Sequence, residues 1–265
     1  MSPRGLTRRA GVRGLLSDTL VIAERNLIRL PRAPELLLAF TVQPIMFLLL
    51  FRYVFGGAIA TPGLAYVQFL IPGIIVQNIA FGGFVTALGL NEDVHKGLID
   101  RFRSLPMARA AVLAGRTFSD IVTNTLSLVI LLITGIIIGF SFNADVAHVI
   151  AGILLLLLFG YAFSWVFAFV GLIASTPESA NSVAFIAIFP LTFISSAFVP
   201  VASMPAPLQD FARINPFTLT VNALRSLWLG LPAGNYVWGA VAWTIGITAV
   251  FAPLAVSRYR KQARS

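Results

Sequence analysis

The chain has 265 residues, of which 58% are hydrophobic and 11% charged, and 19 Lys and Arg against 10 Asp and Glu give a net charge of +9. A soluble domain is about 25% charged, so this chain has too few charged side chains to cover a soluble exterior. The composition excludes an ordinary soluble enzyme, a disordered chain and a collagen-like chain, and it predicts an all-α, polytopic membrane protein.

The first 35 residues are rich in arginine and come before any long apolar run. Leu16, Leu20, Ala23, Leu27 and Leu30 recur at helical spacing, while charged residues occupy another face. We predict that residues 1–35 form a cytoplasmic amphipathic helix in the inner-leaflet interface, with its arginines toward anionic lipid head groups. A solvated cytoplasmic helix is the alternative.

Six stretches with few charged residues have the length of about 20 residues that crossing roughly 30 Å of hydrocarbon requires. They cover residues 36–55, 66–90, 117–142, 146–174, 180–201 and 236–256. We therefore predict six transmembrane helices within a domain at 36–256, followed by a cytoplasmic tail at 257–265.

Basic residues predict the orientation of these helices. They gather in the N-terminal region, between the second and third spans, and after the sixth, whereas the connections 56–65 and 141–145 have none. Cytoplasmic loops of membrane proteins are enriched in Lys and Arg. We expect a plasma (inner) membrane protein with both termini cytoplasmic, and no nucleic-acid partner, because topology accounts for the positive charge.

The cytoplasmic connection at 91–107 is short and carries charges of both signs. Val94, Leu98, Arg101, Phe102 and Leu105 share one side of a helix. Pro106 ends that helix. Such a helix suits docking into a groove on a partner protein. An ordinary solvated loop remains the alternative.

The connection between the fifth and sixth spans is external but apolar. Ser203 with Pro205 is typical of a helix start, and Asn215-Pro216 interrupts the chain before a second run of helical spacing that Gly230 ends. We predict two short re-entrant helices at 203–232, since irregular backbone at membrane depth must be covered by protein or line a cavity. A plain external loop is the alternative.

Several polar residues lie inside the predicted spans. Arg116 and Asp120 are four residues apart, which predicts a pair on one face of a helix. Gln43, Gln77 and Asn78 are candidates for a substrate path, or for hydrogen bonds to neighbouring helices.

Sequence motifs for catalysis are missing. The pattern GxxxxGK(S/T) does not occur, because the only lysines are Lys96 and Lys261, so the chain is not expected to bind ATP or to be an enzyme. There is no Cys, and the only histidines are His95 and His148. An integral-membrane enzyme would need clustered His, Asp or Glu, and a secondary transporter would show internal repeats. Both are weaker alternatives.

Three segments together resemble a known family. The first is Asn91-Glu92-Asp93 with Lys96-Gly97 and Asp100-Arg101-Phe102-Arg103-Ser104-Leu105-Pro106-Met107, the second is Leu70-Ile71-Pro72-Gly73-Ile74, and the third is 195–205 followed by Asn215-Pro216-Phe217. This order over nearly the whole chain is similar to ABC-2-type transporter permeases, and most of all to the daunorubicin/doxorubicin-resistance branch.

The resemblance implies a role for each segment. The loop would hold a coupling helix seated on a separate ATPase, which would bind ATP and Mg. The external helices would close the outer mouth, and two permease copies, identical or paralogous, would join two ATPase copies. The coupling residues would be Glu92, Asp93, Lys96, Gly97, Asp100, Arg101, Phe102, Leu105 and Pro106, and the candidate path or outer gate would comprise Gln43, Gln77, Asn78, Phe198, Asn215 and Phe217. The cargo would be a hydrophobic or amphiphilic drug or lipid, with polysaccharide or lipo-oligosaccharide as the alternative.

Overall fold

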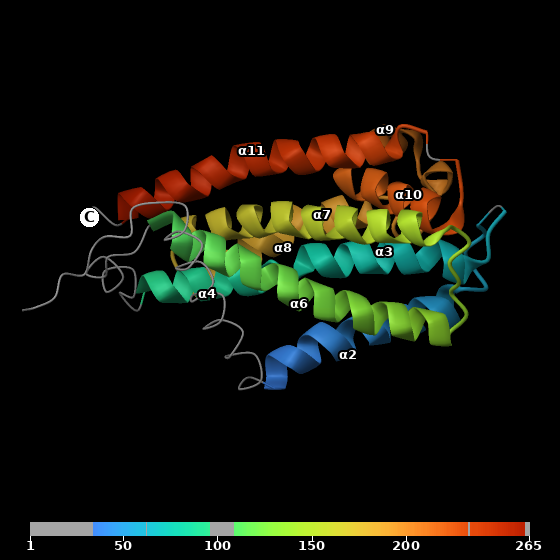
Figure 1. Cartoon of the computed structure of the whole chain (residues 1–265), viewed down its shortest axis with the longest axis horizontal. Coiled ribbons are helices and arrows are strands. Elements are labelled where there is room, and N and C mark those ends of the chain that lie inside the picture. Colours follow the sequence, from blue (N-terminus) through green and yellow to red (C-terminus); the bar gives the residue numbers. More distant parts are fainter. Residues whose placement is uncertain (1–33, 62, 96–108, 233, 263–265) are drawn as a thin grey trace, which may run out of the picture.

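The computed structural model describes residues 34–61, 63–95, 109–232 and 234–262, and every regular element in these ranges is a helix (Figure 1). The elements are α2 (Pro34–Leu50), the π-helical turn η2 (Phe51–Phe55), α3 (Tyr66–Phe81), α4 (Phe84–His95), α6 (Arg109–Ile137), α7 (Val146–Ile173), α8 (Pro177–Phe193), the 3-10 turn η3 (Val201–Ser203), α9 (Ala206–Ile214), α10 (Pro216–Leu229) and α11 (Tyr236–Gln262).

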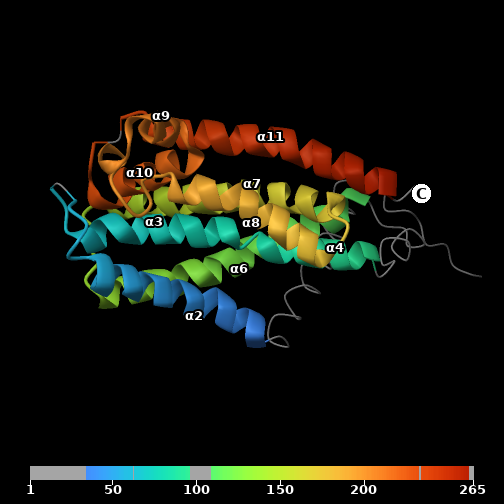
Figure 2. The same ribbon diagram turned by 180° about the vertical axis from the view of Figure 1, so that it is seen from behind.

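The long helix α7 is the centre of the bundle. It contacts α3, α4, α6, α8, α10 and α11, while α2 lies at the periphery against α3 and α6 (Figures 1 and 2). At one end of the bundle α4 and α11 finish and α6 begins; we call this the α4 end. At the opposite end, the α10 end, lie α9 and α10.

Four stretches are long and apolar enough to cross a membrane: Tyr66–His95, Gly115–Ile137, Val146–Ile173 and Tyr236–Lys261. They confirm a multi-pass membrane protein and coincide with four of the six predicted spans. The other two predicted spans correspond to α2 with η2 and to α8. Because α2 and α8 have 17 residues each, their crossing of the membrane stays a prediction.

The helix α6 is polar inside and apolar outside. Thr117, Asp120, Asn124 and Ser127 are buried against the bundle. The opposite face exposes Phe118, Val122, Leu126, Val129 and Ile133. In water, burying these polar side chains and exposing the apolar ones would cost free energy. In a membrane, the exposed apolar side chains contact the hydrocarbon of the lipids. The side-chain distribution therefore agrees with the membrane assignment.

Several element boundaries differ from those predicted. Helix α4 continues to His95, so Asn91, which the sequence placed in a loop, is helical. Helix α6 ends at Ile137 because Gly139 turns the chain with a φ of +105°. Helix α8 ends at Phe193, well before residue 201, and α11 runs beyond residue 256 into the predicted tail.

The two short helices predicted at 203–232 are present as α9 and α10. Pro205 precedes α9, and the Asn215 side chain accepts a hydrogen bond from the Phe217 backbone N–H at 2.8 Å, which starts α10. Gly230 ends α10 in the left-handed conformation, with a φ of +70°. The predicted helix within residues 1–33 and most of the 91–107 loop lie outside the described residues.

Candidate functional site

A cavity of about 560 Å³ lies between α2, α3, α4 and α8. Its polar lining consists of four carboxamide side chains: Gln43, Gln77, Asn78 and Asn181. Its apolar lining is dominated by six phenylalanines: Phe47, Phe81, Phe84, Phe185, Phe189 and Phe193. The structure thus brings together Gln43, Gln77 and Asn78, the three polar residues that the sequence suggested for a path.

A break between α3 and α4 shapes this cavity. Gly82 and Gly83 belong to neither helix. The Gly82 N–H nevertheless donates a helix-type hydrogen bond to the Asn78 carbonyl at 2.9 Å. A Cβ atom on Gly82 would lie 2.3 Å from the Asn124 Oδ1 atom, and one on Gly83 would lie 2.2 Å from the Phe167 ring. Glycine therefore permits the close contact with α6 and α7, and the break lies beside the cavity, which Gly82 lines.

A column of stacked aromatic rings leads from the cavity to the α10 end. Ring centroids are 4.9 Å apart for Phe185 and Phe189, and 4.3 Å apart for Phe189 and Phe193. Phe198 continues the column at 5.1 Å from Phe193 and also stacks on Phe51 at 4.6 Å. Phe198 itself is buried and does not line the cavity; it closes the column.

The other two predicted gate residues lie in the packed core of the α10 end. The Asn215 amide donates to the carbonyls of Leu191 and Ile194 at 2.7 and 2.8 Å, which attaches the start of α10 to the last turn of α8. Phe217 is fully buried, with its ring edge against Phe159 and Phe163. Neither residue lines the cavity, so their contacts indicate a role in positioning.

Arg225 of α10 is a residue that the sequence reasoning missed. Its side chain is buried, and its Nη2 atom donates to the carbonyls of Phe69 and Ser196, both at 2.7 Å. Its Nη1 atom donates to the Asn222 Oδ1 atom at 2.9 Å, and its Cζ atom lies 3.5 Å from the Phe69 ring centroid. Within the described ranges, neutral oxygens accept all its hydrogen bonds. An arginine between Leu224 and Trp228 on the apolar stripe of α10 was the available signal.

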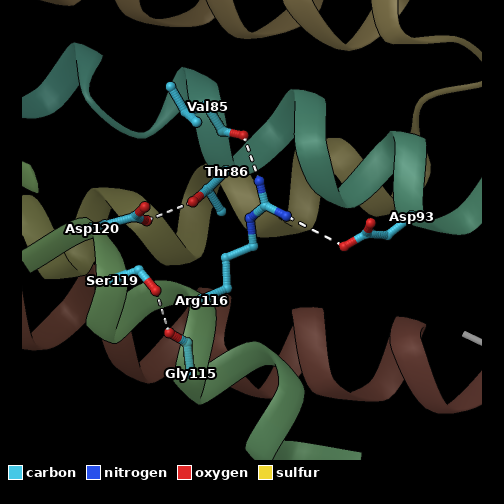
Figure 3. A network of polar contacts seen from close by, with 7 residues as sticks. All are labelled: Val85, Thr86, Asp93, Gly115, Arg116, Ser119 and Asp120. Carbon is cyan, nitrogen blue, oxygen red and sulfur yellow. Dashed lines mark hydrogen bonds and ion pairs between the residues drawn. The ribbon is translucent and has the colours of Figure 1, made fainter. Parts of the chain in front are cut away.

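At the α4 end, a polar network joins α4 and α6 (Figure 3). Arg116 of α6 forms an ion pair with Asp93 at 3.4 Å and donates to the Val85 carbonyl at 2.9 Å. Thr86 donates to the Asp120 carboxylate at 2.6 Å. The sequence predicted that Arg116 and Asp120 pair with each other; instead each turns to a different partner on α4, because burial between helices favours interhelical contacts.

Gly89 makes room for this network, since a Cβ atom there would lie 1.8 Å from the Arg116 Nη2 atom. Nearby, Asn91 donates to the carbonyls of Gly171 and Ala174 at 3.0 and 2.8 Å. The His95 Nε2 atom lies 2.7 Å from the Ser175 carbonyl. The last turn of α4 is therefore attached both to α6 and to the end of α7.

Two of the nine predicted coupling residues are described. Asp93 is buried in the network, and Glu92 is exposed. The other seven lie outside the described residues: Lys96, Gly97, Asp100, Arg101, Phe102, Leu105 and Pro106.

The described residues contain no candidate metal site, because no three His, Asp or Glu side chains among them are grouped so that they could hold a metal ion. In the connection before α7, Asp145 caps the helix by accepting from the His148 backbone N–H. A side-chain hydrogen bond from His148 lowers the pKa of the Asp145 carboxyl.

Comparison with known proteins identifies one family and several relatives that match most of the chain. The family model for the ABC-2 type transporter matches residues 17–229. The daunorubicin resistance ABC transporter permease protein DrrB1 of Streptomyces coeruleorubidus is 36% identical over 248 residues, covering 93% of this chain and 87% of the relative. The probable doxorubicin resistance ABC transporter permease protein DrrC of Mycobacterium tuberculosis is 28% identical over 254 residues, covering 93% and 89%. The probable multidrug ABC transporter permease YbhR of Escherichia coli is 22% identical over 203 residues, covering 76% and 54%.

Proposed function

The chain belongs to the ABC-2 type transporter family, and on that premise we propose that it is the transmembrane permease subunit of an ATP-binding-cassette exporter. It moves a hydrophobic or amphiphilic drug or lipid outward across the plasma membrane. A separate ATPase subunit binds and hydrolyses the ATP. Two permease copies, identical or paralogous, and two ATPase copies make up the exporter.

The proposed topology has six spans and both termini in the cytoplasm. The α4 end then faces the cytoplasm, and the α10 end faces outward with α9 and α10 as re-entrant helices. A 17-residue helix is about 26 Å long at roughly 1.5 Å per residue, so α2 and α8 cross most of the hydrocarbon. The π-helical turn η2 extends α2, and the turn at 194–200 extends α8.

The observation that carries the proposal is the position of α4. At one end this helix lines the cavity through Phe84, and at the other it leads directly into the predicted coupling segment. The contact between Asp93 and Arg116 holds together the two helices that flank this segment. A push on the segment by a partner ATPase would therefore move both helices, and α4 would alter the cavity wall.

The experiment reconstitutes the chain with its ATPase in proteoliposomes and compares ATP hydrolysis with export of doxorubicin, chosen because a relative bears its name. We expect E92Q/R101Q to hydrolyse ATP but to export at least tenfold more slowly. The matched control is D210N/R213Q, which removes an exposed pair at the other end of the molecule and should export normally.

Normal export by E92Q/R101Q would show that the 91–107 segment has no coupling role. Export by the permease without any ATPase would contradict the proposed function as a whole.

A further inference from the structure

Three amides outside the cavity form hydrogen bonds within the protein, in contrast to the four that line it. Asn91 and Asn215 each donate two hydrogen bonds to backbone carbonyls, and Gln68 bonds to the Gly139–Ser141 turn. In contrast, the cavity amides Gln43, Gln77, Asn78 and Asn181 form no side-chain hydrogen bond to the described part of the protein.

Gln77 and Asn78 are half-buried, whereas Gln43 and Asn181 are exposed on the single chain. A polar group without a hydrogen-bond partner in an apolar environment costs roughly 2–7 kcal/mol, depending on the reference state. Three helices contribute these side chains to one space: α2 supplies Gln43, α3 supplies Gln77 and Asn78, and α8 supplies Asn181. Their donors and acceptors are thus available to the head of a ligand.

Among the described residues that line the cavity, none has an ionisable side chain. Nearby buried charges have partners within the protein: Arg116 with Asp93, Asp120 with Thr86, and Arg225 with backbone carbonyls. An anionic ligand head would lose hydration here without meeting a positive charge, which disfavours a phosphate or a carboxylate. A hydroxyl donates and accepts, as a carboxamide does, so the two groups match.

The order of residues along two helices gives the ligand a direction. Asn181 precedes Phe185, Phe189 and Phe193 along α8, and Gln43 precedes Phe47 along α2. Both helices run toward the α10 end (Figure 2). An amphiphile would therefore place its polar head among the amides and its apolar chain along the stacked rings.

We propose that this cavity binds an uncharged amphiphile with a hydroxyl-bearing head, of the chemical class of a neutral glycolipid, in preference to an anionic phospholipid with the same chains. The proposal rests on the proposed function, since it names the substrate class of the permease. A volume of about 560 Å³ lies within the roughly 300–1,000 Å³ of small-molecule sites, enough for such a head and part of a chain.

The test measures binding to the permease–ATPase complex in nanodiscs without ATP, so that its result does not depend on export. The probe is a monoglucosyl dioleoylglycerol with a photoreactive acyl chain, and the competitors are unlabelled monoglucosyl dioleoylglycerol and dioleoyl phosphatidylglycerol. We expect the glycolipid to displace the probe at a concentration at least tenfold lower than the phospholipid.

Variants test the assignment to the amides. Q77L/N78L should weaken glycolipid binding about tenfold and leave phospholipid binding unchanged. Q68L is the matched control, because Gln68 is a carboxamide on the same helix that does not line the cavity. Q43L, on the peripheral helix α2, gives a second measurement if the double variant fails to fold.

Equal displacement by both lipids, or stronger displacement by the phospholipid, would overturn the substrate class while leaving the proposed permease function intact. Selective glycolipid binding that Q77L/N78L and Q43L do not alter would overturn the role of the amides. Conversely, selective binding without ATP-dependent export would support this site and contradict the proposed function.

Discussion

Replacing Arg225 by methionine tests how the α10 end is held together. Methionine is unbranched and flexible enough to fill much of the same space, but it removes five hydrogen bonds, two of them to carbonyls at 2.7 Å. A hydrogen bond to a charged group contributes about 1.5–3 kcal/mol, and the released cost of burying the guanidinium offsets part of the loss. We therefore expect R225M to lower the free energy of unfolding by about 3 kcal/mol.

For a chain of this size, that loss corresponds to a decrease in Tm on the order of 8 °C. Arg225 also holds the turn at 195–198, where Ser195 is fully buried. Because the protein has no cysteine, S195C provides a single label site. Maleimide should react with it at least tenfold faster in the R225M background, whereas A202C, which replaces an exposed residue, should react equally in both.

The Lys variant separates charge from shape. A lysine ammonium keeps the charge but lacks the planar fork that reaches the Phe69 and Ser196 carbonyls together, so R225K should give an intermediate Tm. If R225M matched the parent protein in both Tm and S195C labelling, the conclusion that Arg225 holds α10 against α3 would be wrong.

Two further substitutions probe the other helix contacts. R116A removes the ion pair with Asp93 and the hydrogen bond to the Val85 carbonyl and should lower the free energy of unfolding by about 1.5–3 kcal/mol, as measured by thermal unfolding against R116K, which keeps the charge. G73A should unfold well below the parent Tm, since its Cβ atom would lie 2.0 Å from the Ala197 carbonyl oxygen in a contact between two backbones, whereas G246A has nothing within 4 Å and should change the free energy of unfolding by no more than about 1 kcal/mol. A normal Tm for either R116A or G73A would refute the corresponding contact.

Features that depend on local chemistry were predictable from the sequence. The start of α9 after Pro205, the junction at Asn215-Pro216 and the end of α10 at Gly230 follow from preferences for proline, asparagine and glycine at helix ends. The four longest apolar stretches were also identified, because a membrane selects for length and hydropathy along the chain itself.

Features that depend on distant partners were not predictable. Arg225 bonds to a carbonyl 156 residues away, and nothing near it in the sequence indicates that partner. The same applies to Arg116, whose nearest acid along the helix is Asp120 but whose partner is Asp93. The amides at positions 43, 77 and 78 were noted as polar, but only the packing of separate helices shows that they face one cavity.

The segment Tyr66–His95 links the three sites of the molecule. Near its beginning, the Phe69 carbonyl accepts from Arg225; at its middle, Gln77 and Asn78 line the cavity; and near its end, Asp93 pairs with Arg116. The break at 82–83 lies between the cavity amides and the α4 end, so a movement of α4 reaches the cavity wall first. One connection from the cavity to the α10 end runs through α3, which Arg225 ties to α10. Since backbone carbonyls accept these bonds, α3 and α10 must shift together or lose them.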